Sequence, residues 1–422
     1  MRDVAIIGAG AAGLATAIFA RRADPTSRVV VFDGARRPGA KILVSGGGRC
    51  NVTNTVVSDS DFWGGKRTIV RRILRAFRPA DAVELFHALG VPLHEEADGK
   101  LFPDSNRARD VLEALLKGVS DSGAVLRAGT RVHAVSCADD RFTLATSEGL
   151  VAASRVVLAS GGQSLPKTGS DGLGYEIARS LGHTIVPRTP ALAPLLLDPE
   201  TAYSIHRGLS GVSLDGELVV WVDGAVSTRL AGALLWTHFG ASGPVVLNAS
   251  RHWARARLEH RNVRLTLNYY PGQTFEAVDR RLRPSSSGGQ AHLRTLRGHL
   301  ASDMPDAVAR AILRVLAIPE DQALGSLTRD DRRRLARALT EWPLPVADTR
   351  GYNFAEVTAG GVALDEIDPS TMESRRCRGL YLVGEILDVD GRIGGFNFQW
   401  AWSSAFVAAR GLVRLRDAVA HS

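Results

Sequence analysis

The stretch VAIIGAGAAGLATAIFARRADPTSRVVVFD, residues 4–33, decides the fold. Val4–Ile7 is a continuous apolar run typical of a buried parallel strand, Leu14–Arg22 predicts a helix, and Arg28–Asp33 predicts a second strand. The turn between the first strand and the helix matches GxGxxG and consists of Gly8, Ala9, Gly10, Ala11, Ala12 and Gly13. Its first glycine permits a tight turn, its second lets the backbone approach a pyrophosphate, and its third lets the helix pack against the strand.

An acidic residue completes this pattern. Asp33 ends the second strand, twenty residues after Gly13, where its carboxylate can accept hydrogen bonds from ribose hydroxyls. The start of the helix adds unpaired N–H groups and the positive end of the helix dipole, both of which favour phosphate. The context therefore predicts an α/β domain that binds a dinucleotide, although the motif alone does not distinguish FAD from NAD.

A second glycine-rich segment, PGAKILVSGGGRCN, covers residues 38–51. Three consecutive glycines expose backbone N–H groups to an anion or a ring edge, and two basic side chains add positive charge. Two such sites in one nucleotide domain favour a long cofactor with a second ring system, as in FAD; a flexible basic loop is the competing interpretation. We interpret Cys50 as a packing residue rather than a nucleophile. The candidate cofactor residues here are Lys41, Ser45, Gly46, Gly47, Gly48, Arg49, Cys50 and Asn51.

The rest of the chain predicts a discontinuous organisation. Prolines at 187, 190, 194 and 199 mark a domain crossing, and glycine-rich apolar sequence returns after about Thr349. We expect a Rossmann-like α/β domain over 1–188 and 346–422, a mostly-β substrate-side domain over 189–272 and about 341–345, and an arginine-rich helical subdomain over 273–340. The individual elements predicted are helices at Pro79–Leu89 and Arg109–Ser122, extended segments at Ala124–Val135, Arg141–Thr146 and Val151–Ala159, a hairpin of Glu217–Val222 with Ala225–Arg229, a strand at Val263–Tyr269 and a flexible loop at Ser285–Gly289.

Composition narrows the class of protein. The 422 residues are 45% hydrophobic and 23% charged, which suits a folded core and excludes a disordered chain. The three cysteines form no CxxC pair, so the sequence indicates no disulfide framework and no metal, and we expect a reducing, cytoplasmic location. Residues 4–20 are uncharged like a membrane segment, but their glycines suit a phosphate-binding turn, and we expect no membrane partner.

The net charge of +8 is concentrated in one region. Residues 251–340 contain 17 arginines and 9 acidic residues, and this difference equals the net charge of the whole chain. Such a region can meet nucleic acid or an acidic partner. Because no nucleic-acid motif accompanies it, we favour a solvated helical surface and expect a small-molecule substrate with no stable nucleic-acid partner. The sequence leaves the oligomeric state open.

Several longer motifs resemble a known family. They are GAKILVSGGGRCNVTN (39–54), THFGASGP (237–244), TAGG (358–361) and the tail GLYLVGEILDVDGRIGGFNFQWAWSSAFVAARG (379–411). Together they resemble the BaiN and aminoacetone-oxidase-like flavoproteins, FAD-dependent oxidoreductases with the glutathione-reductase-type FAD fold. The resemblance covers most of the chain, but residues 251–340 carry no recognised motif.

The resemblance implies a site for non-covalent FAD. Val132 would meet the adenine through its backbone, and a helix from about Asn397 to Arg410 would point its N-terminus at the flavin, with Trp400 and Trp402 as packing residues. On this basis Gly395→Val is expected to fold normally and lose the flavin. The other implied cofactor contacts are Ala159, Ser160, Gly161 and Gly162 near the pyrophosphate, and Gly384, Glu385, Asp388, Gly394, Gly395, Asn397 and Gln399 near the ribityl chain and flavin.

The implied activity is two-electron, hydride-type chemistry. The resemblance permits reduction of a conjugated C=C bond with NADH or NADPH, or oxidation of a small amine of the aminoacetone type. A flavin-containing RNA-modification or nucleic-acid-binding protein is the rival from another class. No second GxGxxG follows Gly13 in a strand–helix setting, so NADH or NADPH would be a transient reductant. His238, in a glycine-flanked loop, is the candidate proton donor, with a purely structural loop histidine as the favoured alternative.

Overall fold

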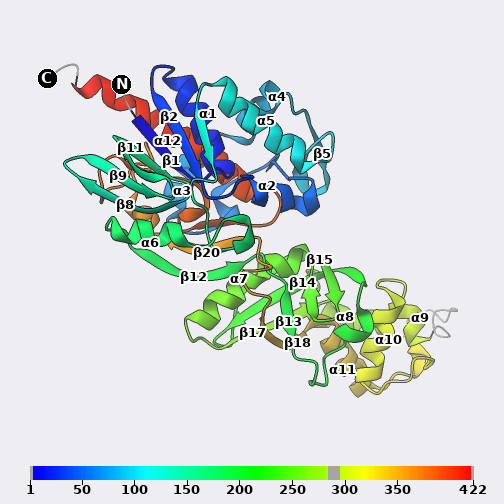
Figure 1. The fold of residues 1–422 in the computed structure, drawn as a ribbon. Helices are drawn as coiled ribbons and strands as arrows, with labels where there is room; N and C mark the ends of the chain where they lie inside the picture. Colours follow the sequence, from blue (N-terminus) through cyan, green and yellow to red (C-terminus); the bar gives the residue numbers. More distant parts are fainter. Residues whose placement is uncertain (1–2, 284–294, 420–422) are drawn as a thin grey trace. The chain divides into compact units, whose positions relative to one another are not determined.

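The computed structural model describes residues 3–283 and 295–419, which form two compact units (Figure 1). Unit 1 combines Met1–Arg188 with Glu356–Ser422, and unit 2 is Thr189–Ala355. The first crossing between the units therefore falls after residue 188, as the sequence suggested. The return falls after residue 355, ten residues later than the sequence suggested.

The centre of unit 1 is a five-stranded parallel sheet in the order β21-β11-β1-β2-β7. From β1 the chain passes to β2 and β7 on one side and then to β11 and β21 on the other. This reversal beside β1 is a topological switch point, and ligands bind there beyond the carboxyl ends of the strands. The predicted Rossmann-like fold is confirmed. The strands are β1 (Asp3–Ile7), β2 (Arg28–Asp33), β7 (Val125–Ala128), β11 (Arg155–Leu158) and β21 (Leu380–Leu382).

The first and last helices of the chain lie side by side in unit 1 (Figure 1). These are α1 (Ala11–Ala23) and α12 (Phe396–Val419). The small residues of α1 are buried from Ala12 to Ala20, which allows the close approach. Trp400 and Trp402 on α12 are almost fully buried, as expected for packing residues. The C-terminal segment therefore completes the domain that the N-terminal segment begins.

The remaining elements of unit 1 cover this sheet or form small antiparallel sheets. Residues 151–159, predicted as one strand, divide at Ser154 between β10 and β11, which belong to different sheets. Helix α3 was not predicted. The helices are α2 (Ala40–Val44), α3 (Arg67–Ala76), α4 (Pro79–Ala88), α5 (Ala108–Asp121) and α6 (Leu173–Ser180). The paired strands are β8 (Val132–Ala138), β9 (Arg141–Thr146) and β10 (Gly149–Ala153); β3 (Thr53–Asn54), β6 (Lys100–Pro103) and β5 (Leu93–Glu96); β4 (Phe62–Gly64) and β22 (Val389–Gly391); and β12 (Ile185–Ala191) and β20 (Val357–Val362).

Unit 2 is built on a seven-stranded antiparallel sheet. The predicted hairpin forms between β14 (Ser213–Val222) and β15 (Ala225–Thr237), with Asp223 and Gly224 both at positive φ in the turn. That conformation matches the right-handed twist of the two strands. The other strands are β13 (Leu195–Leu197), β16 (Gly240–Ser242), β17 (Val263–Asn268), β18 (Trp342–Leu344) and β19 (Val346–Thr349).

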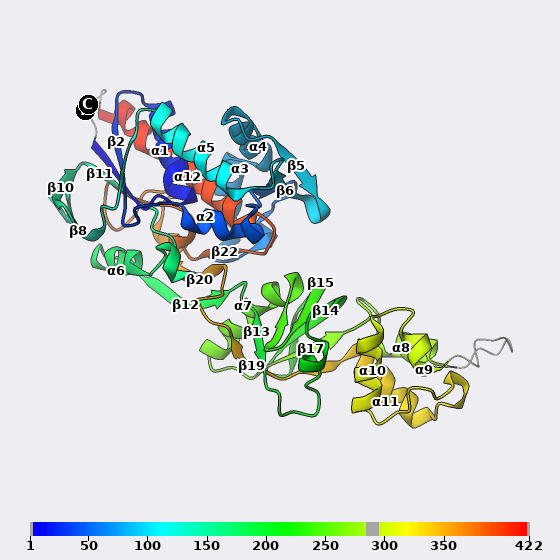
Figure 2. The same cartoon turned by 45° about the vertical axis from the view of Figure 1, so that its right-hand side comes forward.

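Helices cover the sheet of unit 2 and share its core. One hydrophobic cluster contains Leu218 and Leu267 from the sheet together with Ile312 and Leu335 from the helices. Figure 2 shows α8–α11 gathered at one end of this unit. The predicted loop at 285–289 lies outside the described residues. The helices are α7 (Pro244–Leu258), α8 (Phe275–Arg281), α9 (Leu296–Leu300), α10 (Asp306–Val315) and α11 (Arg329–Thr340). Among the residues that the structure describes, none of the helices combines the length and apolar character needed to cross a membrane.

His183 is a buried titratable group in the core of unit 1. Its Nδ1 lies 2.9 Å from Glu366 Oε2 and its Nε2 lies 2.8 Å from Ser374 Oγ. Burial disfavours the imidazolium and lowers the pKa of His183 below its ordinary value of 6.5, although Glu366 acts in the opposite direction. Because Ser374 Oγ also accepts the N–H groups of Arg376 and Cys377, this chain of hydrogen bonds fixes a turn in the core.

We expect the protein to lose stability as the pH falls below about 6.5, because the unfolded chain takes up a proton at His183 that the folded chain does not. For one such proton the free energy of unfolding falls by at most about 1.4 kcal/mol per pH unit. Urea unfolding of wild type and His183→Gln at neutral and mildly acidic pH measures this slope. We expect a shallower slope in His183→Gln. Some pH dependence should remain in this variant, because burial also lowers the pKa of His206. Equal slopes would assign the pH dependence to other groups.

Candidate functional site

The glycine turn after β1 has two glycines that packing requires and one that it does not. Gly8 has a φ of +104°, and a Cβ there would lie 2.5 Å from the carbonyl oxygen of Ala159. A Cβ on Gly13 would lie 1.9 Å from the carbonyl oxygen of Gly8. A Cβ on Gly10 would meet no atom within 4 Å, so this side of the turn is open. A pyrophosphate can approach the backbone there, as the motif predicts.

Helix α1 begins at Ala11, three residues earlier than expected, so the second half of the motif is its first turn. The first N–H that bonds within the helix belongs to Leu14, which donates to Gly10 O at 3.0 Å. The helix itself therefore leaves the N–H groups of Ala11, Ala12 and Gly13 available beside the open face of Gly10.

Asp33 lies at the carboxyl end of β2, against the glycine turn. Its Oδ2 accepts the N–H of Ala9 at 2.7 Å and its Oδ1 accepts the N–H of Ala35 at 2.8 Å. The side chain is partly exposed, and each oxygen keeps a lone pair for a ribose hydroxyl. Asp33 also faces Ala128 of β7, from which the chain leads to Val132 at the start of β8. These positions agree with an adenosine-binding end of the site.

The turn after β11 lies on the other side of the switch point. Ala159 donates its N–H to Ile7 O at 2.9 Å, and Gly161 has a φ of +73°. Among the described residues no hydrogen-bond partner is found for the buried Oγ of Ser160. A Cβ on Gly162 would lie 2.5 Å from Thr358 Oγ1 and 2.6 Å from Glu385 Oε1, so this turn needs a glycine where it meets the tail.

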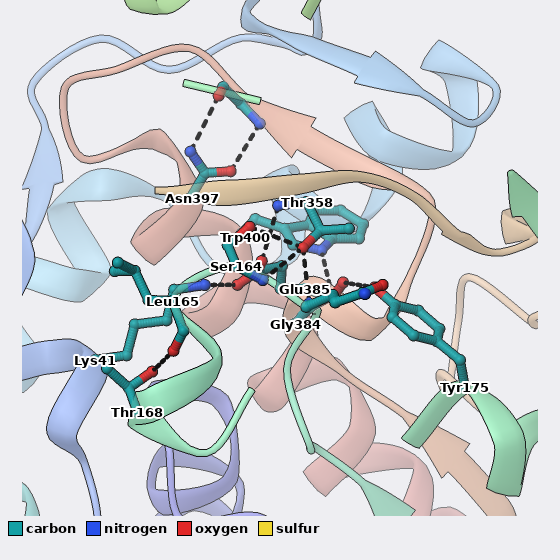
Figure 3. Close-up of polar contacts among 12 residues, drawn as sticks. Lys41, Ser164, Leu165, Thr168, Tyr175, Thr358, Gly384, Glu385, Asn397 and Trp400 are labelled. Atoms are coloured by element: carbon teal, nitrogen blue, oxygen red, sulfur yellow. Dashed lines mark hydrogen bonds and ion pairs between the residues drawn. The ribbon is translucent and has the colours of Figure 1, made fainter. Parts of the chain in front are cut away.

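Glu385 joins the two ends of the chain at this edge (Figure 3). Its Oε2 lies 2.5 Å from Lys41 Nζ, and its Oε1 accepts the N–H of Thr358 at 2.9 Å. Thr358 Oγ1 in turn accepts the N–H of Gln163 at 2.8 Å. The Glu385 side chain is only 18% exposed, so the Lys41 ammonium neutralises a carboxylate that is largely removed from water. The TAGG motif contains Thr358, but the sequence suggested no role for it.

The segment after β21 also contacts the glycine turn. Gly384 has a φ of +74°, and a Cβ there would lie 2.8 Å from the Cβ of Ala12. Its N–H donates to Ser404 Oγ at 3.0 Å and its carbonyl oxygen accepts Trp400 Nε1–H at 3.1 Å, as Figure 3 shows for the tryptophan. Further along, the carbonyl oxygen of Asp388 accepts the N–H of Gly65 at 2.7 Å. This segment is therefore fixed against both α1 and α12.

The glycines before α12 correct one expectation. Gly394 and Gly395 have φ values of +122° and +91°. A Cβ on Gly395 would lie 2.4 Å from the carbonyl oxygen of Thr53, which is backbone and cannot move aside. The expectation that Gly395→Val folds normally is wrong, because the valine would push β3 away from α12. Loss of flavin in that variant would not distinguish a cofactor contact from local misfolding.

Two predicted contacts near the start of α12 use their amides within the protein. The Asn397 side chain donates to Gly391 O at 3.0 Å and accepts the Gly391 N–H at 2.8 Å (Figure 3). The buried Gln399 accepts from Thr53 Oγ1 at 2.6 Å and donates to Phe77 O at 2.9 Å. These bonds give both side chains a structural role, and the cofactor contacts of these two residues stay predictions. The first turn of α12 still leaves backbone N–H groups available.

The second glycine-rich segment is more ordered than a loop. It forms α2 followed by a tight turn in which Gly46, Gly47 and Gly48 all have positive φ, and Gly47 and Gly48 are exposed. Its polar candidates are bonded to the protein or buried: Lys41 pairs with Glu385, and Ser45 Oγ donates to Ile42 O at 2.7 Å. Arg49 pairs with Glu96 at 2.6 Å, so its charge is not free for an anion.

Cys50 and Asn51 follow this turn and are both buried. Burial raises the pKa of the Cys50 thiol to about 12, so the thiol stays protonated at neutral pH and the packing interpretation is supported. Within the described part of the chain, no hydrogen-bond partner is found for Asn51 Oδ1. A buried acceptor without a donor is a point at which a ligand N–H can bind.

These observations together fit a dinucleotide that carries a second ring system. The open side of Gly10, the acceptors of Asp33 and the unmatched oxygen of Ser160 lie at the carboxyl edge of the sheet, and Asn51, after the second glycine-rich segment, adds another unmatched oxygen. For residues 3–283 and 295–419, there is no group of three His, Cys, Asp or Glu side chains that could hold a metal.

His238 lies in unit 2, on the turn between β15 and β16, and its side chain is exposed. Its ring makes an edge contact with Phe239 at 5.1 Å, and the Arg350 guanidinium lies 4.2 Å from the centre of the Phe239 ring. The described residues give His238 no acidic partner. Its role as a proton donor stays a prediction.

The fold and this edge define a class, the FAD-binding flavoproteins of the Rossmann type. The family model described as "HI0933-like protein Rossmann domain" matches residues 2–411, and the chain belongs to this family. The resemblance to BaiN-type flavoproteins is thereby confirmed, and the protein is an FAD-dependent oxidoreductase.

Relatives match over nearly the whole chain. The ribosomal RNA dihydrouridine synthase of Escherichia coli is 33% identical over 418 residues, covering 98% of this chain and 99% of that protein. The 3-dehydro-bile acid delta(4,6)-reductase of Clostridium scindens is 32% identical over 410 residues, covering 97% and 98%. The solved 3-ketosteroid delta1-dehydrogenase of Sterolibacterium denitrificans is 13% identical with a TM-score of 0.50, covering 98% and 99%, which supports the fold.

Proposed function

We propose that this protein reduces a C=C bond conjugated to a carbonyl group, with NADH or NADPH as the electron donor. The observation that carries the proposal is the pair of full-length relatives named above. A delta(4,6)-reductase and a dihydrouridine synthase both saturate a C=C bond that is conjugated to a carbonyl group, although their substrates differ greatly in size. A flavin site common to the family, combined with a substrate-binding region that varies, would explain how both relatives carry out the same type of reaction.

The residues of this chain have separate tasks in the proposal. FAD, when bound, would supply hydride-transfer chemistry. Asp33 and the open face of Gly10 would hold its ADP half, and the Lys41–Glu385 pair would present polar groups to its ribityl chain. The N-terminus of α12 favours negative charge on the pyrimidine end of the ring. His238 is kept as the candidate proton donor, with a structural loop histidine as the alternative.

We expect NADH and NADPH to reduce the flavin from a weak, transient complex, because the chain has one dinucleotide motif and FAD uses it. The dissociation constant for either nucleotide should be weaker than micromolar, which corresponds to a binding free energy less favourable than about −8 kcal/mol. Anaerobic stopped-flow absorbance gives this constant from the dependence of the reduction rate on nucleotide concentration. Saturation below micromolar concentration would reveal a dedicated nucleotide site.

The same anaerobic protein tests the reaction itself. Once reduced, its flavin is mixed with a cyclic enone, with a uridine-containing RNA, or with oxygen, and the return of the oxidised absorbance is followed. Reoxidation by an enone or RNA at least tenfold faster than by oxygen is expected. Rapid reduction by a small amine, together with reoxidation only by oxygen, would instead support an amine oxidase.

RNA is the second candidate substrate, and one surface favours it. Arg329, Arg333 and Arg337 recur every four residues along α11, so they lie on one face of the helix, and all three are exposed. The described residues provide no acid within ion-pair distance of these three. Other arginines among the described residues of this region do pair with acids, including Arg261, Arg264, Arg281, Arg283, Arg297, Arg310, Arg332 and Arg334.

Free arginines on a helix face suit phosphates, and binding to RNA would weaken steeply with salt. Changing the three α11 arginines to glutamine should then reduce RNA affinity and flatten its salt dependence. Changing the paired Arg261 and Arg264 should have a smaller effect. Unchanged reduction of the enone in both variants would separate RNA binding from flavin chemistry.

A further inference from the structure

Cys137 and Cys377 are neighbours in unit 1 although they are far apart in the sequence. Cys137 lies on β8 opposite Phe142 of β9, and Cys377 lies in the turn before β21. The two thiols lie close enough to interact, because Cys137 contributes to the raised pKa of Cys377. No spacing motif relates them, so only the fold brings them together.

Independent contacts hold the same two segments together. A Cβ on Gly379 would lie 3.1 Å from the Phe142 ring, and Arg378 lies 3.6 Å from Asp140. The turn that carries Cys377 is itself fixed, because the Cys377 N–H donates to Ser374 Oγ at 2.8 Å. The proximity of the two cysteines therefore also rests on the packing of the segments that carry them.

The two thiols differ in access to solvent. Cys137 is exposed, whereas Cys377 is partly buried. Burial, together with the neighbouring Cys137, raises the pKa of Cys377 to about 12, so this group is a thiol at neutral pH. A dissolved oxidant therefore reaches Cys137 first. The third cysteine, Cys50, is buried and serves as an internal reference.

A metal site does not explain the pair. Two thiols supply half of the ligands of a structural zinc site. Across residues 3–283 and 295–419, no third or fourth ligand joins them in a cluster that could hold a metal. The nearby carboxylate of Asp140 faces the Arg378 guanidinium. The chemistry left to two adjacent thiols of unequal exposure is oxidation.

We propose that Cys137 and Cys377 form a reversible disulfide when the protein meets hydrogen peroxide. The Cys137 sulfur attacks the peroxide O–O bond, which gives a sulfenic acid and one water. The Cys377 sulfur then attacks the Cys137 sulfur, so that the S–S bond forms and a second water leaves. In total, two thiols lose two electrons and two protons to one peroxide, and a reducing dithiol reverses the step by exchange.

The disulfide would connect two segments that lead into the flavin site. Strand β8 begins at Val132, and the turn at Cys377 precedes β21 and Glu385. A cross-link across so long a loop restricts the unfolded chain, so the oxidised protein should unfold at a higher temperature. Because Cys377 stays protonated, we expect oxidation to be slow compared with that of dedicated peroxide-reactive cysteines.

The test is to treat the FAD-loaded, full-length protein with hydrogen peroxide, block free thiols with an alkylating reagent under denaturing conditions, and measure intact and peptide masses. Two of the three thiols should become unavailable, a linked peptide pair containing Cys137 and Cys377 should appear, and Cys50 should remain alkylated. Dithiothreitol should restore all three. The variants Cys137→Ser and Cys377→Ser should each form no linked pair.

Two outcomes would overturn the proposal. One is overoxidation of Cys137 to a sulfinic acid while Cys377 is still alkylated. The other is a disulfide between two chains, seen as a dimer on a non-reducing gel. The expected rise in unfolding temperature on oxidation should be absent from Cys137→Ser, which keeps the remaining packing unchanged. Thiol counting does not depend on substrate turnover, so it tests the disulfide whether or not the proposed reaction is correct.

Discussion

Gly10→Val is expected to fold normally and to purify without FAD. The position has ordinary extended backbone, with φ −83° and ψ −171°, and a Cβ there meets no atom within 4 Å. A Cβ at this position therefore meets no atom of the protein, and the loss of N-cap preference costs about 1 kcal/mol. Its methyl groups would occupy the face where a pyrophosphate approaches the backbone. FAD binding should weaken at least about a hundredfold, which corresponds to about 2.7 kcal/mol.

Gly208→Val is the matched control for this variant. Gly208 also has open space around its Cβ position and no positive φ, but it lies in unit 2. Both variants should give the circular-dichroism spectrum of the wild type, and only Gly10→Val should lose its flavin absorbance after gel filtration. A yellow Gly10→Val protein with full FAD occupancy would mean that the cofactor does not pass over this turn.

Trp402→Ala is expected to destabilise unit 1 by about 3–5 kcal/mol, the usual cost of removing a large aromatic side chain from a core. Trp402 is fully buried, stacks on Phe398 at 5.5 Å and makes an edge contact with Phe86 at 5.3 Å. Its Nε1–H donates to Val52 O at 2.9 Å, and the substitution would leave that buried carbonyl unpaired.

Urea unfolding followed by circular dichroism measures the change in the free energy of unfolding. The control is Val56→Ala, since Val56 is 72% exposed and its truncation should change stability by less than about 0.5 kcal/mol. A similarly small change in Trp402→Ala would mean that α12 is not part of the core of unit 1.

The sequence predicted those helices and strands whose stabilising contacts are between residues close together in the chain. The strand–turn–helix–strand pattern of residues 4–33 and the position of Asp33 at the end of β2 follow from periodicity and glycine spacing, and both appear in the structure. Strand β9 and the β14–β15 hairpin were predictable for the same reason. Their residues interact mainly with near neighbours in the chain, so a short window contains the relevant information.

Contacts between distant segments could not be predicted in this way. The Lys41–Glu385 pair, the placement of Thr358 against Gly162 and the proximity of Cys137 to Cys377 depend on which elements the fold brings together. The same limit explains the error at Gly395. The residue type indicated a close backbone approach, but the approaching group is Thr53 of the protein itself.

The most direct test of the account compares two flavins on the apoprotein. FMN carries the isoalloxazine ring and the ribityl phosphate but lacks the adenosine part of FAD, so it cannot use Asp33 or reach across the glycine turn. Calorimetric titration should show FAD binding at one per chain and FMN binding at least about a thousandfold more weakly, a difference of about 4 kcal/mol. Equal affinity for FAD and FMN would contradict the assignment of the β1 turn and Asp33 to the cofactor.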